Sequence, residues 1–294
     1  MASLVSKAFI IFLKLINKKS FLKKQFDYGK FDFYTSPKPP QSLSNRCLIQ
    51  HRTLHERNVF TLRPKQHSTD KHILYLHGGA YVQNFVRQHW TFIGLLIDTL
   101  HCTITAPDYP LAPKHSYKDA FAMVVSLYKE LIHHVLPSNL ILMGDSAGGG
   151  FALALAQYLR TKNIPQPKQI FLLSPWLDIT LRNPEILAID PKDPFLGIEG
   201  LRRAGITYAG DADPESYMLS PINGSLEGLA KIHLFIGTRD ILVADSRKLK
   251  VLLQEKGIAM YYYECEDMIH VWMLLNFPES KMAQGEIIRL IKEA

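Results

Sequence analysis

The feature that most restricts the fold of this chain is a run of small residues between two apolar segments. Residues 140–143 are continuously apolar, the sequence Gly144-Asp145-Ser146-Ala147-Gly148-Gly149-Gly150 follows, and a second apolar segment begins at Phe151. Short apolar runs are typical of strands that are buried on both faces of a parallel sheet. Glycines permit a sharp turn after such a strand. We therefore predict a strand, a tight turn at Ser146 and a helix over residues 151–160.

An alternation of short apolar strands and amphipathic helices extends along the chain. Ser116 and Asp119 are spaced as a capping box, and apolar residues recur at helical spacing as far as residue 134. Further strands are expected at 46–52, 58–62, 72–77, 102–106, 169–173, 232–236 and 260–264, and further helices at 245–255 and at the C-terminus. Strands separated by helices indicate an α/β fold with a mostly parallel sheet.

Two segments depart from this alternation. Residues 178–220 are dense in Pro, Gly, Asp and aromatic residues, which is typical of an insertion. Residues 8–13 form an apolar run that Lys14 ends, and this run is shorter than the roughly 20 residues that cross a bilayer. Lysines after the run and the lack of a small-residue cleavage site argue against a secretory signal. The alternatives are a helix that packs on the protein, which we favour, and one that lies on a membrane surface.

The charge of the chain is unevenly distributed. The formal net charge is +7, but residues 1–65 hold 13 Lys and Arg against 3 Asp and Glu, whereas residues 66–294 hold 21 against 24. A basic excess confined to the N-terminal segment argues against nucleic acid as a partner. Peripheral contact of this segment with an anionic membrane remains open.

The three cysteines, Cys47, Cys102 and Cys265, are far apart and lack the spacing of metal ligands. They fit free thiols in a reducing compartment, so a cytoplasmic location is expected. No metal or other cofactor is predicted.

The segment around Ser146 has the pattern G-x-S-x-G in its required context, after a strand and before a helix. A serine on a strand-to-helix turn has an exposed hydroxyl, and the helix behind it directs a positive dipole end toward a developing oxyanion. Ser146 is therefore the candidate nucleophile.

An acyl-transfer serine also needs hydrogen-bond donors for the oxyanion. The sequence His77-Gly78-Gly79-Ala80-Tyr81 follows an expected strand, and its glycines leave backbone N–H groups unobstructed. The expected donors are the amides of Gly78, Gly79 and Ala147. His77 is interpreted as a residue that fixes this loop.

The general base and its orienting acid should follow in the order Ser, Asp or Glu, His. Of the twelve histidines, His270 alone lies in a loop after the final expected strand. Asp240 follows the preceding strand and is the expected orienting carboxylate. Its rivals are Asp245, interpreted as the N-cap of a helix, and Asp267, which is too close to His270 in the chain.

Together these residues resemble the hormone-sensitive lipase family of α/β-hydrolase esterases. The resemblance covers roughly residues 70–290 and rests on residues 77–80, 144–149 and 174–178, with Asp240 and His270. Two departures are Ala80, where the family has a third glycine, and the segment Tyr109-Pro110-Leu111-Ala112-Pro113-Lys114, which lacks the family's arginine and acid.

The resemblance implies an α/β-hydrolase fold with a helical cap. Residues 1–40 would be an N-terminal cap segment, residues 41–177 and 221–294 the catalytic domain, and residues 178–220 a cap insertion. The resemblance also makes a homodimer plausible.

The expected function is that of a serine carboxylesterase acting on small, short-acyl esters through an acyl-enzyme. Candidate pocket walls are aromatic: Tyr81, Trp176, Phe195, Tyr208, Tyr217 and Trp272. An amidase, deacetylase or peptidase using the same triad remains an alternative. A non-catalytic binding protein is disfavoured because Ser146, Asp240 and His270 are all present.

Overall fold

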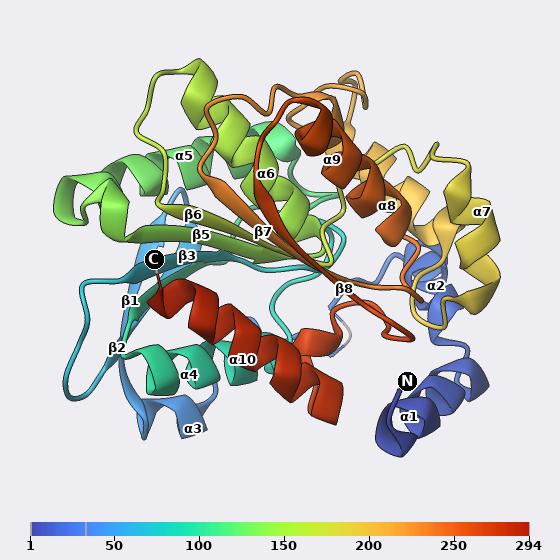
Figure 1. Cartoon of the computed structure of the whole chain (residues 1–294), viewed down its shortest axis with the longest axis horizontal. Coiled ribbons are helices and arrows are strands. Elements are labelled where there is room, and N and C mark those ends of the chain that lie inside the picture. The colour runs from blue at the N-terminus through green and yellow to red at the C-terminus, as the bar shows by residue number, and fades with distance from the viewer. Residues whose placement is uncertain (1, 33, 294) are drawn as a thin grey trace.

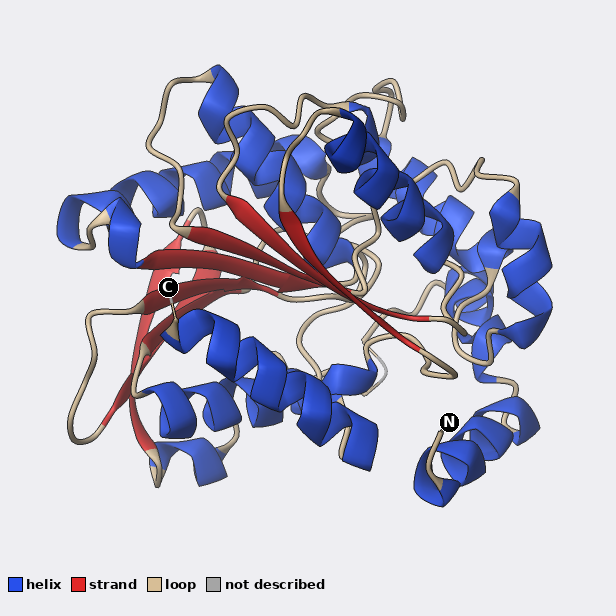
Figure 2. Ribbon diagram, in the orientation of Figure 1, coloured by secondary structure: helices blue, strands red, loops and turns tan. Residues whose placement is uncertain are grey.

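In the computed structural model, which describes residues 2–32 and 34–293, helices cover both faces of a central twisted sheet (Figures 1 and 2). The described strands are β1 (Cys47–Leu54), β2 (Arg57–Pro64), β3 (His72–Leu76), β4 (Thr103–Pro107), β5 (Leu140–Asp145), β6 (Gln169–Leu173), β7 (Lys231–Gly237) and β8 (Met260–Cys265). They lie in the order β1-β2-β4-β3-β5-β6-β7-β8. β2 is antiparallel to both β1 and β4, and the remaining pairs are parallel. The predicted α/β fold and each predicted strand are confirmed.

The helices fall into layers. Their bounds are α1 (Leu4–Leu15), α2 (Phe21–Tyr28), α3 (Gln41–Ser44), α4 (Arg87–Leu100), α5 (Tyr117–His134), α6 (Ala147–Thr161), α7 (Glu185–Ile189), α8 (Ile198–Ala209), α9 (Val243–Glu255) and α10 (Pro278–Lys292). α4 and α10 cover one face of the sheet, and α5, α6 and α9 cover the other (Figure 1). The capping box of α5 is present, because the Ser116 N–H donates to Asp119 Oδ2 at 2.8 Å.

The core follows the alternation of side chains along each strand. On β5, Leu142 belongs to the apolar cluster beneath α5 and α6, whereas Ile141 and Met143 belong to the cluster beneath α4 and α10. All three side chains are buried. Burial on both faces explains why this strand reads as a continuous apolar run.

Three local predictions need correction. The sequence analysis placed no helix between residues 77 and 102, where α4 lies; its apolar residues recur at helical spacing, but Val86 at its N-cap is not a capping residue and no acidic residue marks its first turn. α6 begins at Ala147 rather than at residue 151, so the glycines lie inside the helix. The N-cap interpretation of Asp245 is wrong, because α9 begins at Val243 and Asp245 is its third residue.

The N-terminal helices and the 178–220 insertion lie together at one end of the molecule (Figure 1). α2 packs along α8 from the insertion. Two ion pairs at 2.8 Å join the N-terminal segment to the insertion, Lys19 with Asp190 and Lys23 with Glu199. Within the described ranges, no helix is long and apolar enough to cross a bilayer.

Candidate active site

Ser146 occupies the sharp turn between β5 and α6. Its backbone has a φ of 52° and a ψ of −121°, a strained conformation for a residue with a side chain. The Ser146 N–H donates to Leu173 O of β6 at 2.8 Å, and the Ser146 carbonyl accepts from the Trp176 N–H at 2.9 Å. A Cβ atom on Gly148 would overlap the carbonyl groups of β3, so glycine is required for α6 to begin here. The neighbouring strands thus hold the Ser146 hydroxyl at the carboxyl end of the sheet.

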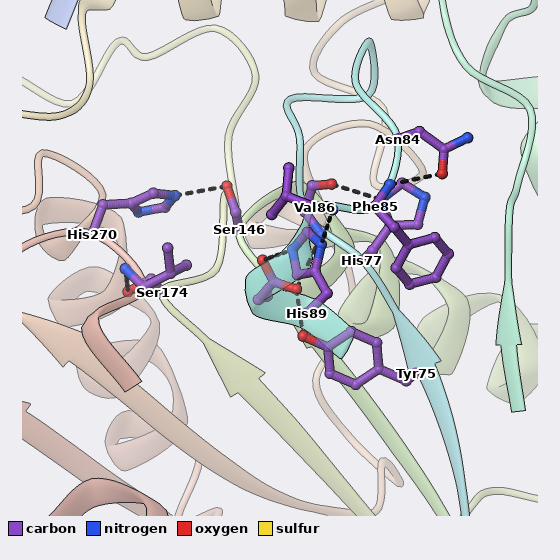
Figure 3. A network of polar contacts seen from close by, with 12 residues as sticks. Tyr75, His77, Asn84, Phe85, Val86, His89, Ser146, Ser174 and His270 are labelled. Atoms are coloured by element: carbon purple, nitrogen blue, oxygen red, sulfur yellow. Dashed lines mark hydrogen bonds and ion pairs between the residues drawn. The ribbon is translucent and has the colours of Figure 1, made fainter. Parts of the chain in front are cut away.

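His270 connects Ser146 with Asp240 through two hydrogen bonds. His270 Nε2 lies 2.9 Å from Ser146 Oγ, and His270 Nδ1 lies 2.7 Å from Asp240 Oδ2. The side chains of His270 and Ser146 point toward each other in Figure 3. Asp240 is fully buried, and His270 is only 3% exposed. The structure therefore brings together the three residues that the sequence singled out.

The protonation pattern of His270 follows from its partners. A carboxylate can only accept, so Nδ1 carries the proton and the neutral ring presents Nε2 as an acceptor for the Ser146 hydroxyl. Burial alone would lower the pKa of His270, but the charge and hydrogen bond of Asp240 outweigh it, and the pKa is raised above its ordinary value. The site thus favours a proton on this imidazole more than water does.

The loops that carry His270 and Asp240 are fixed by polar contacts. The Val271 N–H donates to Ser174 Oγ at 3.1 Å (Figure 3), and the Asp267 N–H donates to Thr238 Oγ1 at 2.8 Å. The carboxylate of Asp267 is engaged by Arg239 at 2.7 Å.

The other rival carboxylate, Asp245, lies in α9. It accepts from Asn183 Nδ2 at 2.9 Å, and burial raises its pKa to about 6. Neither Asp245 nor Asp267 bonds to His270.

Asp193, which the sequence analysis overlooked, is a second buried carboxylate near the loop that carries Asp240. Its Oδ1 accepts from the N–H groups of Phe195 and Leu196, and its Oδ2 accepts from the Ile241 N–H at 2.9 Å. Burial, and then the charge of Asp240, raises the pKa of Asp193 to about 7. Asp193 therefore connects the insertion to the loop that carries Asp240 through a hydrogen bond. In the sequence, Asp193 is followed by Pro194 in an irregular segment, and no motif there predicts this contact.

The loop after β3 has an unusual backbone. Gly79, Ala80 and Tyr81 have φ values of 124°, 53° and 61°. The Gly78 N–H donates to Asp145 Oδ1 at 3.0 Å, so it is already engaged and does not face an open site as expected. No partner within the described residues engages the amides of Gly79, Ala80 or Ala147. The prediction that Gly78 is an oxyanion donor therefore needs correction, because the Asp145 carboxylate already accepts the Gly78 N–H.

His77 is buried beneath this loop, with Nδ1 2.6 Å from Gly78 O and its ring stacked on Tyr109. Burial, and then the charge of His89, lowers the pKa of His77 to about 4. A neutral ring that holds the Gly78 carbonyl agrees with the interpretation of His77 as a loop-fixing residue.

Asp145 is the centre of a polar network that the sequence analysis missed. It accepts from Tyr75 Oη at 2.7 Å and lies 3.2 Å from His89 Nε2 (Figure 3). The Val86 N–H donates to His89 Nδ1 at 2.9 Å, so Nε2 carries the proton. Burial would raise the pKa of Asp145, but His89 and Tyr75 outweigh it and the pKa is lowered. The sequence does contain one hint of this network, since Asp145 is an acidic residue at the end of the otherwise apolar strand β5.

The aromatic pocket candidates divide into groups. Tyr81 stacks on Tyr208 at 3.9 Å and lies 5.7 Å from Trp176, all three buried beside α6. Trp272 is not among them, because it lies in the apolar cluster beneath α4 and α10.

Two further candidates lie elsewhere. The Phe195 ring is 5.6 Å from the ring of His270. Tyr217 is half-buried and interacts with Thr161 at the end of α6.

Comparison with known proteins gives consistent matches. The family described as having an alpha/beta hydrolase fold matches residues 73–274. An esterase from Acinetobacter venetianus is 30% identical over 227 residues, covering 76% of this chain and 75% of that protein. An acetyl-hydrolase from Streptomyces hygroscopicus is 30% identical over 214 residues, covering 72% of each. The crystal structure of an esterase/lipase from an uncultured bacterium superposes with a TM-score of 0.81 at 26% identity, covering 97% of both chains.

Proposed function

This chain belongs to the alpha/beta-hydrolase family and is a carboxylic ester hydrolase, and from this premise we propose that it is of the hormone-sensitive-lipase type and that Ser146 is its nucleophile. The observation that carries the proposal is the hydrogen-bonded chain Ser146–His270–Asp240, with distances of 2.9 and 2.7 Å. Serine is a weak nucleophile at neutral pH and needs such a base.

In the first half of the reaction, Ser146 Oγ attacks the ester carbonyl carbon while its proton passes to His270 Nε2. Asp240 holds the Nδ1–H tautomer and stabilises the imidazolium that forms. The raised pKa of His270 supports this role, because the site stabilises the protonated ring. When the tetrahedral intermediate collapses, the alcohol leaves with the proton from Nε2, and an acyl group remains on Ser146.

The negative oxygen of the intermediate needs donors, and the unengaged amides of Gly79, Ala80 and Ala147 are proposed for this role. Ala147 is the first residue of α6, where the positive end of the helix dipole assists. The hydrogen bond from Gly78 to Asp145 supports a different role for Gly78, which is to hold the loop.

In the second half, His270 takes a proton from water, and the resulting hydroxide attacks the acyl carbon. The proton then returns from Nε2 to Ser146 Oγ as the acid leaves. The overall reaction converts ester and water into acid and alcohol.

The nucleophile is tested with Ser146→Ala on a p-nitrophenyl ester. We expect kcat to fall by about 10⁴-fold or more, with binding and oxyanion stabilisation alone left. An organophosphate should label the wild-type chain stoichiometrically and not the variant. Ser225→Ala, which changes an exposed serine, is the control. Wild-type-like turnover in Ser146→Ala would refute the assignment.

A matched pair of p-nitrophenyl ester and anilide tests the bond that is cleaved. The relatives named esterase and acetyl-hydrolase support ester preference. A higher kcat/KM for the anilide would favour the amidase, deacetylase or peptidase alternative.

We further propose that the preferred acyl groups are short. The supporting observation is the stack of Tyr81, Tyr208 and Trp176 rings, which fills the space beside the first turns of α6. A series of p-nitrophenyl esters of increasing acyl length measures this preference. A rate maximum beyond about eight carbons would contradict it.

The N-terminal segment 1–40 and the insertion 178–220 are proposed to form one cap over the catalytic domain. Support comes from Lys18, whose ammonium lies 5.1 Å from the centre of the Phe195 ring, beside His270. The ion pairs of Lys19 and Lys23 with the insertion further support a single unit.

A further inference from the structure

Helix α1 is attached to the body along one stripe only. Ser6, Ile10 and Leu13 are its buried residues and recur at helical spacing. The Phe9 ring meets Phe277 edge-on at 5.3 Å, just before α10 begins. The hydroxyls of Ser3 and Ser6 donate to Glu279 at 3.0 and 3.2 Å. These contacts fix which face of α1 is turned outward.

The outward face of α1 is apolar. Leu4, Ile11 and Leu15 lie on one stripe opposite the buried one and are 84%, 58% and 80% exposed. Further exposed apolar residues flank this stripe: Val5, Phe12 and Ile16. A surface helix of a globular protein normally turns polar residues outward. An apolar stripe of this kind marks an interaction surface rather than a solvated one.

Cations border this apolar face. Lys7 and Lys14 are exposed on one side of it and form no ion pair with any described residue, whereas Lys19 and Lys23 are paired with the insertion. The basic excess of the whole chain lies in residues 1–65. An apolar face beside unpaired lysines complements a surface that is apolar inside and anionic outside.

We propose that α1 docks on an anionic lipid bilayer, with Leu4, Ile11 and Leu15 inserted among the acyl chains and Lys7 and Lys14 at the headgroups. α1 has 12 residues, or about 18 Å of helix, so it lies in the interface and does not span it. A second copy of this chain is a less suitable partner for the apolar face of α1. Pairing two such faces would bring Lys7 and Lys14 of both copies together without any acidic partner.

Docking would place the candidate active site close to the lipid. The chain leaves α1 at Ile16 and, two residues later, Lys18 lies against Phe195, which packs near His270. This part of the inference rests on the proposed function: esters dissolved in the bilayer are the substrate class that this arrangement presents to Ser146.

Sedimentation with vesicles tests the docking. The full chain should sediment with vesicles that contain phosphatidylglycerol, less with phosphatidylcholine alone, and less as salt is added. Leu4→Gln/Ile11→Gln/Leu15→Gln should weaken binding by about tenfold or more for each inserted side chain. Lys7→Gln/Lys14→Gln should weaken binding to anionic vesicles by about 30-fold.

The matched control is Leu136→Gln/Leu187→Gln/Ile206→Gln, which changes three leucine or isoleucine residues of similar exposure elsewhere and should bind as wild type does. Every variant should retain its kcat/KM on soluble p-nitrophenyl acetate, which shows that it folds. Absence of wild-type binding to anionic vesicles, with that turnover intact, would overturn the docking and leave the proposed function standing. A dimer in lipid-free solution that only the α1 triple variant abolishes would assign the face to a second copy and also overturn it.

Discussion

Asp145 links the candidate nucleophile to the loop that is proposed to hold the oxyanion. It directly precedes Ser146, and its carboxylate accepts from the Gly78 amide and from Tyr75 while it faces His89. Such a buried charge is tolerated only when its hydrogen bonds are satisfied. The partners of this one carboxylate therefore influence both stability and the position of the catalytic loop.

Tyr75→Phe and Tyr208→Phe form a matched pair that tests the value of this network. The Tyr75 hydroxyl donates to a buried carboxylate, so its removal should destabilise the fold by about 1.5–3 kcal/mol. The Tyr208 hydroxyl is buried with no hydrogen-bond partner among the described residues, so its removal should be neutral or stabilising. Urea unfolding measures both, and equal losses would contradict the account.

Asp193→Asn tests the electrostatics around His270. The neutral imidazole is the proposed base, so kcat/KM should rise with pH as His270 loses its proton. Asp240 raises the pKa of His270 most, and the negative charge of Asp193 contributes to the extent that this carboxyl, with a pKa of about 7, is ionised. Removal of that charge should lower the pKa of His270 and move the acid limb of the profile to lower pH. Asp211→Asn, at an exposed position, is the control, and a limb that stays in place or moves upward would refute the coupling.

At the scale of elements, glycines have opposite roles in α6 and α10. A Cβ atom on Gly148 would overlap backbone carbonyls of β3 and the loop after it, whereas a Cβ atom on Gly285 would meet nothing within 4 Å. The first glycine permits a close approach between helix and strand, and the second only weakens its helix.

Gly285→Ala should therefore stabilise the protein by about 0.5–1 kcal/mol, because alanine favours helix interiors. The melting temperature should rise by about 2 °C. Gly148→Ala should cost about 1–3 kcal/mol or more through overpacking. Thermal melts of the two variants measure this, and a gain in stability at both positions would show that α6 does not depend on the close approach.

The elements that could be predicted are those with a local signature. β5 is a continuous apolar run, and α5 has a capping box and regular periodicity. α4 has the periodicity but lacks the start signal, because its N-cap is Val86 and its first turn holds no acidic residue. α6 begins at Ala147, four residues before the predicted start, because only glycine allows its first turn to pack this closely against β3. The low helix propensity of glycine alone would have predicted a later start.

The candidate site shows the same division. Ser146, Asp240 and His270 follow from order along the chain and from their places after strands. The network of Asp145 and the contact between Asp193 and Ile241 join residues that are far apart in sequence. Only the folded chain reveals such contacts, and one of them, at Gly78, changes the expected set of oxyanion donors.

At the scale of the whole molecule, the N-terminal segment packs on the rest of the chain. Leu22, Phe26 and Phe31 pack against the apolar cluster beneath α5 and α6. Beyond them, α1 turns an apolar face to the outside. One segment thus contributes to the protein's own packing and to the proposed lipid contact.

Deletion of residues 1–30 separates these contributions. We expect lower kcat/KM on a soluble ester and a lower melting temperature, because Leu22 and Phe26 leave the apolar cluster and Lys18 leaves Phe195. The α1 triple variant, in contrast, should lose only vesicle binding. Unchanged turnover and melting in the deleted chain would show that the segment is not part of a cap.

The strand order has a consequence for how the chain acquires activity. Ser146 and His270 are 124 residues apart, and His270 is carried by the loop after β8, the last strand of the chain and one edge of the sheet. Parallel pairing of distant segments is slow, since each pair closes a long loop before contacts stabilise it. The hydrogen bond between these two side chains therefore forms only when the edge strand is in place. During refolding, hydrolysis should return with the last structural phase rather than with early helix formation.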